Sequence, residues 1–399
     1  MIALAIAVAD VAAGVSYQLV TGHSWLYRDL HREAERRAIE REYRRAHPLY
    51  HHDLRKNVSV EGVVWGPLQY RVATDDLGFK TTARSRRYES PQRWLALGDS
   101  FVEGVGYAFR ATAIGRLEDE LGLKIYNAGV ASYSPVIYRR KLRYLLDDVG
   151  LKFERLLLFL DISDARDEMR FYRYADSCDC VVARSTEIDG WFDGQADVGE
   201  PLSWASSTGL KGWAERNTML TFRVLDYARG LARGDGVSRY AMPAPLHPQS
   251  DRSDAVSWTY DPRAYDALGR EALELMARSL DRIADLVRAH GVELSVVVYP
   301  WPQQVLFETD PASSRQVTYW RDWCQKRDVD FVQLFEAFHG TDRPGRVTRY
   351  FVPGDVHWNE EGHALVADTL AGHFRGRALV ANGPRRPPSL PSASLKLRD

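Results

Sequence analysis

The chain has 399 residues, of which 45% are hydrophobic and 27% are charged, an ordinary composition for a globular protein with a large core. Its length exceeds one average domain but suits an α/β enzyme with a single core and extensions. The formal net charge of −1 excludes the basic footprint that nucleic acid or anionic lipid requires, so we expect no nucleic-acid partner.

Residues 2–20 are nearly all small or apolar. As a helix they would span roughly 30 Å, the thickness of a hydrocarbon core. Asp10 lies in the middle and costs about 3 kcal/mol on insertion scales, and no basic residue precedes the segment. We expect residues 1–22 to form a membrane anchor or a signal-like helix, with a soluble helix as the remaining alternative.

Residues 23–91 are expected to form a charged helical stalk followed by a small β extension. The stretch from Arg28 to Arg45 alternates acidic and basic side chains, which is typical of a solvated helix. Its basic residues favour a cytoplasmic flank, which conflicts with the extracytoplasmic core inferred below, so the orientation stays open. The stretch from Val60 to Phe79 contains short alternating apolar runs separated by Gly and Pro, as strands and turns do.

Residues 92–380 show alternating strand and helix patterns, which predict a parallel sheet between two layers of helices. The predicted buried strands are Trp94–Leu97, Lys124–Tyr126, Leu156–Leu160, Leu294–Tyr299 and Phe331–Leu334. The predicted helices are Ala111–Leu121, Pro135–Asp147, Pro262–His290, Ser314–Lys326 and Glu360–Phe374. The expected fold is therefore a three-layer α/β/α architecture with a central, mainly parallel five-stranded sheet.

An insertion at about residues 165–260 interrupts this rhythm. It combines Gly-, Ser- and Pro-rich stretches with one predicted helix near Trp213–Leu231, and it fits either a substrate lid or an irregular excursion. Residues 381–399 are rich in Pro and Arg, and we expect them to form a disordered tail.

The three cysteines give no disulfide framework. Cys178 and Cys180 are too close in sequence to bridge easily, and Cys324 stands alone. With Asp176 and Asp179 the pair could bind a metal, but no histidine or second cysteine pair has suitable spacing. We therefore expect neither a metal site nor a cofactor.

A serine follows the first predicted core strand directly. The strand ends on Gly98, which permits a sharp turn, and Asp99-Ser100 follow before the next helical pattern. A hydroxyl is thus placed at the carboxyl end of a strand, where open α/β sheets hold their ligands. The alternative is a simple serine cap of a strand-to-helix turn.

A histidine and an aspartate precede the last predicted helix. Asp355 and His357 are two residues apart, so in an extended segment both side chains lie on one side. A carboxylate beside an imidazole fixes its tautomer and stabilises the imidazolium. Asn359 is a good cap for the helix that follows, whereas a solvated polar loop is the alternative.

Taken together, the Gly98–Phe101 and Asp355–Asn359 motifs resemble those of the SGNH, or GDSL-type, hydrolase superfamily, whose fold is flavodoxin-like. The resemblance implies that Ser100 is the nucleophile, His357 the general base and acid, and Asp355 the residue that orients it. Asp99 would then shape the turn. Most of the family has Asp three residues before His. The Asp-x-His-Trp form here looks like the alginate O-acetyltransferase branch, although the chain order is that of the ordinary esterases.

The resemblance also implies an oxyanion hole, which needs two or three donors aimed at the developing negative charge. The family's Gly falls on Ser132, with Gly129 as the neighbouring alternative, and the family's Asn falls on Ser163. The expected donors are the backbone N–H groups of Ser100 and Ser132 together with the Ser163 hydroxyl. We expect Asp164, Asp167 and Glu168 to order the loop or to be solvated, rather than to act in catalysis.

Two tryptophans near the expected site, Trp301 and Trp358, could form a platform for a sugar ring or fill the core. We expect His363 to be structural.

We therefore expect a serine esterase acting on O-acyl, above all O-acetyl, esters of cell-envelope carbohydrate. An O-acetyltransferase is the alternative, as is a non-catalytic glycan-binding or scaffold protein of a polysaccharide-export system. The expected partners are an acylated substrate, the membrane and polysaccharide-assembly proteins. The expected location is membrane-anchored with an extracytoplasmic, periplasmic catalytic domain.

Overall fold

The computed structural model describes residues 2–21, 25, 28–82, 92–184, 213–214, 217–221, 224 and 257–381. Five parallel strands form its central sheet, in the order β11-β10-β7-β5-β6. They are β5 (Arg93–Leu97), β6 (Lys124–Asn127), β7 (Arg155–Leu160), β10 (Glu293–Val298) and β11 (Asp330–Gln333). Each strand lies within one residue of its predicted bounds, so the expected five-stranded parallel sheet is confirmed.

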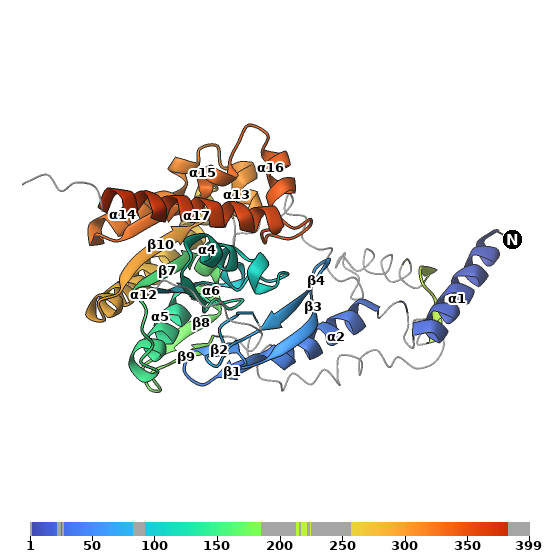
Figure 1. Ribbon diagram of the computed structural model, residues 1–399. Helices are drawn as coiled ribbons and strands as arrows, with labels where there is room; N and C mark the ends of the chain where they lie inside the picture. Colours follow the sequence, from blue (N-terminus) through green and yellow to red (C-terminus); the bar gives the residue numbers. More distant parts are fainter. Residues whose placement is uncertain are drawn as a thin grey trace, which may run out of the picture.

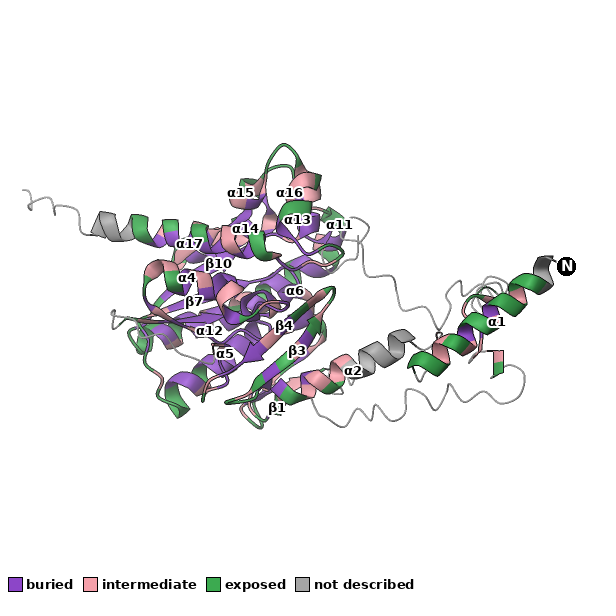
Figure 2. Ribbon diagram, turned by 45° about the vertical axis from the view of Figure 1, so that its right-hand side comes forward, coloured by how far each residue is buried: buried purple, intermediate pink, exposed green. Residues whose placement is uncertain are grey.

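The strands read as continuous apolar runs because both faces of the sheet are covered. In β7, Leu156 and Leu158 belong to one core cluster, whereas Leu157 and Phe159 belong to the other. Figure 2 shows the buried residues concentrated in the sheet and on the helix sides that face it.

Helices cover both faces, which confirms the three-layer α/β/α architecture. On one face lie α5 (Pro135–Arg143) and α12 (Arg270–Ala289), and on the other lie α4 (Ala113–Leu121) and α17 (Glu360–Ala381) (Figure 1). Five-residue π-helical turns, Tyr144–Asp148 and Tyr265–Gly269, follow α5 and precede α12. The remaining helices of the core are α3 (Ser100–Glu103), α6 (Asp164–Arg170), α11 (Pro262–Ala264), α13 (Pro302–Phe307), α14 (Arg315–Arg327), α15 (Phe335–Phe338) and α16 (Arg343–Tyr350).

The order of the strands determines where a site can form. Numbered along the chain within the sheet, the strands run 2-1-3-4-5, the flavodoxin-like order, with β5 and β7 as neighbours. The connections leave these two strands in opposite directions, and ligands bind at such a switch point, outside the carboxyl ends of the strands.

The predicted β extension precedes the sheet as two antiparallel pairs. β1 (Arg44–His47) pairs with β2 (His51–Leu54), and β3 (Ser59–Trp65) pairs with β4 (Leu68–Ala73). Before them, α2 (Arg28–Tyr43) forms over most of the predicted stalk.

The N-terminal helix α1 (Ile2–Thr21) forms as predicted. The membrane anchor expected at residues 1–22 is not supported, because no helix within the described residues is both long and apolar enough to cross a bilayer. Asp10 is buried, and its carboxylate accepts the backbone N–H groups of Met219, Leu220 and Thr221 at 2.8–3.0 Å.

The insertion begins with a hairpin that the sequence did not predict, β8 (Tyr172–Ala175) and β9 (Cys180–Ala183). Most of the predicted helix Trp213–Leu231 and of the expected lid, and residues 382–399 of the expected tail, lie outside the described residues.

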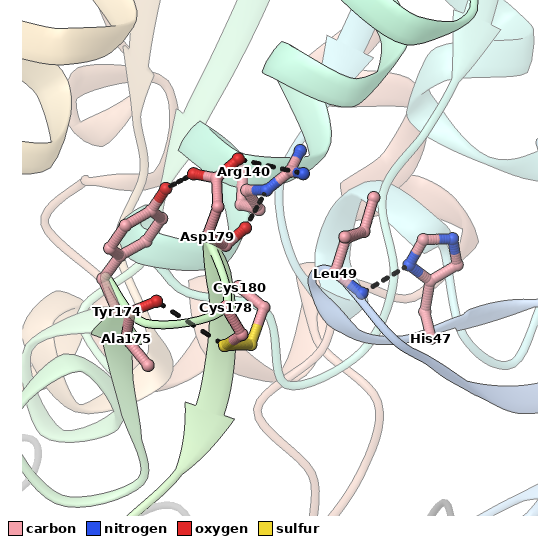
Figure 3. Close-up of a disulfide and its surroundings, with 8 residues drawn as sticks. All are labelled: His47, Leu49, Arg140, Tyr174, Ala175, Cys178, Asp179 and Cys180. Atoms are coloured by element: carbon pink, nitrogen blue, oxygen red, sulfur yellow. Dashed lines mark hydrogen bonds and ion pairs between the residues drawn. A yellow bond between two sulfur atoms is a disulfide. The ribbon is translucent and has the colours of Figure 1, made fainter.

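A disulfide joins Cys178 and Cys180 in this hairpin (Figure 3), so the expectation that the pair is too close to bridge is wrong. Asp179 between them adopts a positive φ of 50°, and the two Cα atoms lie 5.2 Å apart, within the range of ordinary disulfides. The Asp179 side chain contacts Tyr174, Arg140 and Arg143.

Candidate active site

Ser100 is presented by a tight turn between β5 and α3. A Cβ on Gly98 would lie 2.4 Å from a methyl carbon of Val102, so glycine is required there. The Asp99 carboxylate caps α3 by accepting the backbone N–H of Phe101 at 3.0 Å. Ser100 therefore stands at the carboxyl end of β5, beside the switch point, and Asp99 has the predicted role of shaping the turn.

His357 and Asp355 lie on a compact loop before α17. The backbone N–H of Val352 donates to the carbonyl of His357 at 2.9 Å, and that of Asp355 donates to the carbonyl of Val352 at 3.0 Å. Asn359 caps α17 as predicted, because its side-chain oxygen accepts the N–H of Gly362 at 3.0 Å. The loop is thereby fixed at both ends.

The three predicted side chains form one hydrogen-bonded chain. His357 Nε2 lies 2.7 Å from Ser100 Oγ, and His357 Nδ1 lies 2.5 Å from Asp355 Oδ1. With Nδ1–H donating to the carboxylate, Nε2 of the neutral ring is left as an acceptor for the serine hydroxyl. This is the geometry that a histidine needs to take a proton from serine.

The carboxylate of Asp355 is ionised. Burial raises its pKa, but the charge and side-chain hydrogen bond of His357, with the backbone N–H groups of His357 and Val356, outweigh burial and lower the pKa to about 2. A negative charge is thus kept beside the ring that would become positive when it takes a proton.

One contact to this group comes from the N-terminal extension, and sequence reasoning missed it. The indole Nε1 of Trp65, at the end of β3, donates to Asp355 Oδ2 at 2.9 Å. The Trp65 ring stands edge-on to the His357 imidazole, with ring centroids 5.1 Å apart. The Phe101 ring contacts the same imidazole, with ring centroids 4.6 Å apart. A tryptophan before a Gly-Pro turn carries no signal of a partner 290 residues away.

The loop after β6 holds Ser132 in a left-handed conformation, with φ of 64°. The preceding residue, Ala131, is held on both sides: its N–H donates to Glu103 at 2.7 Å, and its carbonyl accepts His52 Nε2–H at 2.9 Å. Among the described residues the Ser132 N–H has no partner, so it stays available as a predicted oxyanion donor.

The other predicted donors differ in outcome. Gly129 is a wrong alternative, because its N–H donates to the Asn127 side chain at 3.1 Å and a Cβ there would meet Val102 at 2.6 Å. Ser163 occupies the N-cap position of α6 after β7, but its side chain makes no capping hydrogen bond, and its backbone N–H donates to the Asp161 side chain. Its hydroxyl has no hydrogen bond within the described part of the chain, so its proposed role stays a prediction.

Buried charges hold the Ala131–Ser132 loop. Arg44 makes two hydrogen bonds to Glu103, at 2.8 and 2.9 Å, and both side chains are buried. Lys141 pairs with Asp53 at 2.8 Å, and burial, opposed by Asp53, lowers its pKa. No local sequence pattern indicates these pairs, since Arg44 and Asp53 come from the extension.

Two buried carboxyl groups next to the nucleophile turn, those of Asp99 and Asp161, share the hydroxyl of Tyr299. The hydroxyl of Tyr299 lies 3.1 Å from Asp99 Oδ1 and 3.2 Å from Asp161 Oδ2. Burial, reinforced by the charge of Asp161, raises the pKa values of Asp99 and Asp164 well above their usual range. One tyrosine hydroxyl carries a single proton, so a neutral Asp99 is consistent with hydrogen bonds to both carboxyls.

Asp164 and Glu168 are buried and order the loop, which is one of the two expected alternatives. Asp164 accepts the N–H of Asp161 and the hydroxyl of Tyr138, each at 3.0 Å. The Glu168 carboxylate accepts hydrogen bonds from the hydroxyls of Ser134 and Ser279, each at 2.9 Å.

The two predicted tryptophans differ in their exposure. Trp301 is partly exposed, and its indole N–H donates to Asp161 at 2.7 Å. Trp358 is only 1% exposed and packs against Phe101 and Tyr299, so its prediction as a substrate platform is wrong. His363 is structural as expected, because its Nδ1 accepts the N–H of Ala113 at 3.1 Å.

Comparison with known proteins gives a result at the level of structure alone. No family model and no curated protein matches the chain. Solved structures similar to it include the psychrotrophic esterase EstA from Pseudoalteromonas sp., a member of the lipolytic G-D-S-L family from Veillonella parvula and a GDSL-like lipase from Bacteroides thetaiotaomicron.

These similarities are distant. EstA is 10% identical with a TM-score of 0.36, over 72% of this chain and 98% of its own. The Veillonella protein is 9% identical with a TM-score of 0.36, over 71% and 98%. The Bacteroides lipase is 9% identical with a TM-score of 0.35, over 74% and 93%. The assignment of a function therefore rests on the geometry of the site.

Proposed function

We propose that the protein is a serine esterase of the SGNH type. The observation that carries the proposal is the unbroken chain from Ser100 Oγ through His357 to the ionised Asp355, at 2.7 and 2.5 Å. A nucleophile bonded to a base, which is itself oriented by a third group, is the arrangement of nucleophilic acyl transfer.

In the proposed reaction, Ser100 Oγ attacks the carbonyl carbon of an ester while His357 Nε2 takes the hydroxyl proton. The N–H groups of Ser100 and Ser132 and the hydroxyl of Ser163 donate to the oxygen that becomes negative. As the tetrahedral intermediate collapses, His357 returns the proton to the leaving alcohol and an acyl group stays on Ser100. Water, activated by His357, then attacks this acyl-enzyme, releasing the carboxylic acid and restoring the serine.

We propose an O-acyl group on carbohydrate, above all O-acetyl, as the substrate. The support is Trp301, a partly exposed indole at the carboxyl edge of the sheet, held by its bond to Asp161. Flat aromatic faces of this kind suit the apolar face of a sugar ring. If a sugar hydroxyl replaced water as the acceptor, the same acyl-enzyme would make the protein an O-acetyltransferase.

We also propose an extracytoplasmic location for the catalytic core. The disulfide between Cys178 and Cys180 supports it, because such bonds persist in oxidising compartments and are rare in the cytosol.

The test is covalent labelling of the full chain with a fluorophosphonate, read by intact mass, together with hydrolysis of a short-chain aryl ester. The wild-type protein should gain one adduct and release acid, whereas Ser100→Ala should do neither. Ser177→Ala is the control, since Ser177 is an exposed serine in the β8–β9 turn and should behave as wild type.

A wild-type protein that neither labels nor hydrolyses any ester would overturn the esterase proposal in favour of a binding or scaffold role. Offering an acetyl donor with and without an oligosaccharide separates the two enzymes. Free acetate supports the esterase, and acetylated oligosaccharide supports the transferase.

A further inference from the structure

We propose that Trp65 is a positioning residue of this active site, holding the Asp355 carboxylate in the plane that His357 requires. The proposal rests on the proposed function, because it assigns a role within the Ser100–His357–Asp355 group. The hydrogen bond from Trp65 Nε1 to Asp355 Oδ2, at 2.9 Å, is its starting point.

The two oxygens of Asp355 have different partners. Oδ1 accepts both the backbone N–H of His357 at 3.0 Å and the ring Nδ1–H of His357 at 2.5 Å. Both donors belong to the residue that the carboxylate must orient. Within the described residues, Trp65 is the hydrogen-bond donor to Asp355 that comes from outside the catalytic loop, and it fixes the second oxygen. Two fixed oxygens define the plane of the carboxylate, and so the direction of Oδ1 toward the imidazole.

The hairpin delivers the indole rigidly. Trp65 pairs with Leu68 across a two-residue turn, in which Gly66 adopts a φ of 55°. A glycine in the first position of such a turn matches the twist of the strands. Leu68 packs on the loop after α3, where a Cβ on Gly106 would lie 2.7 Å from it.

A lysine ties the same loop to the extension. Lys80 Nζ donates to the carbonyls of Gly104 at 2.8 Å and Tyr107 at 2.6 Å. Leu68 and Lys80 therefore join the hairpin and the rest of the extension to the segment that follows the nucleophile, and a positioning group needs this kind of support.

A second indole–carboxylate hydrogen bond, similar to that of Trp65 with Asp355, lies outside the active site. Trp323 Nε1, on α14, donates to Asp281 Oδ1, on α12, at 3.0 Å. Replacing either tryptophan with phenylalanine removes an indole–carboxylate hydrogen bond and keeps an aromatic ring. Trp323→Phe is thus the control for the general cost of losing such a bond.

The experiment compares Trp65→Phe and Trp323→Phe in the full chain with an aryl ester as the probe. A hydrogen bond to a charged group corresponds to roughly a tenfold effect or more. We expect Trp65→Phe to lower kcat about tenfold with KM unchanged within twofold, and Trp323→Phe to leave kcat as in wild type. The far-downfield proton resonance of the His357–Asp355 bond should shift in Trp65→Phe and stay in place in Trp323→Phe.

If Trp65→Phe has the kcat of the wild-type protein and an unshifted resonance, the positioning role is overturned. If that variant does not fold, Leu68→Ala carries the test, because it loosens the hairpin tip and keeps the indole. A lower kcat at unchanged KM then supports the proposal, and wild-type kcat overturns it. Failure of the wild-type protein to label or hydrolyse would instead be a failure of the proposed esterase function.

Discussion

His357 Nδ1 lies 2.5 Å from Asp355 Oδ1, and this short contact leaves Nε2 as the ring nitrogen that accepts from Ser100. Asp355→Asn keeps the shape of the side chain but offers an amide, which favours the wrong tautomer. We expect kcat to fall on the order of 10⁴-fold with the fold intact. Steady-state kinetics and circular dichroism check this, and a variant within tenfold of wild type would remove Asp355 from the mechanism.

Glu103 joins the extension to the loop that carries Ser132. Glu103→Gln would leave Arg44 buried without its charged partner, at a cost of about 3–5 kcal/mol of unfolding free energy. It would also weaken the bond to the Ala131 N–H, so kcat should fall as well.

The matched control is Glu118→Gln. Glu118 is equally buried, pairs with Lys124 at 3.3 Å and accepts the N–H of Ile125 at 2.9 Å, but it lies on α4, away from Ser132. Urea unfolding should show destabilisation of both variants, whereas only Glu103→Gln should lose activity. Equal activities would show that Glu103 serves stability alone.

Asp167 makes stability depend on pH. Burial raises its pKa from the usual 3.8 to about 6, despite the opposing contact with Arg166. Between these values the folded state binds more protons than the unfolded state, so the unfolding free energy falls as pH rises from about 4 to 6. A shift of this size corresponds to about 3 kcal/mol.

Asp167→Asn removes this titration. The unfolding free energy of the variant, relative to that of the wild type, should therefore rise by about 2–3 kcal/mol between pH 4 and pH 7.5. Denaturant unfolding of both proteins at these two pH values measures this difference. Asp322→Asn, an exposed position on α14, is the control and should follow the wild-type dependence. A relative stability of Asp167→Asn that does not change with pH would contradict the raised pKa.

The sequence predicted the sheet and the Ser100–His357–Asp355 contacts because both depend on local patterns. Strands such as Leu156–Leu160 are apolar on every residue, and the two motifs stand at the ends of elements that the sheet brings together. Trp65, Glu103 and His52 were missed because their partners are set by packing of the extension, which no local pattern encodes.

Two of the wrong predictions, those for Trp358 and for the Cys178–Cys180 pair, have different physical causes. A motif gives the position of Trp358 in the chain but not the direction of its side chain, which points into the core. The Cys178–Cys180 bridge was missed because it depends on the left-handed conformation of Asp179, which aspartate adopts only occasionally.

The extension has a consequence for the limits of the functional unit. The predicted α/β core starts at residue 92, but a chain trimmed to that residue would lack the indole on Asp355, the guanidinium on Glu103 and the imidazole on the Ala131 carbonyl. Such a truncated chain would retain every residue of the motifs, but Asp355 and the Ala131–Ser132 loop would lack the hydrogen bonds that the extension makes to them. The functional unit therefore includes the extension as well as the α/β core.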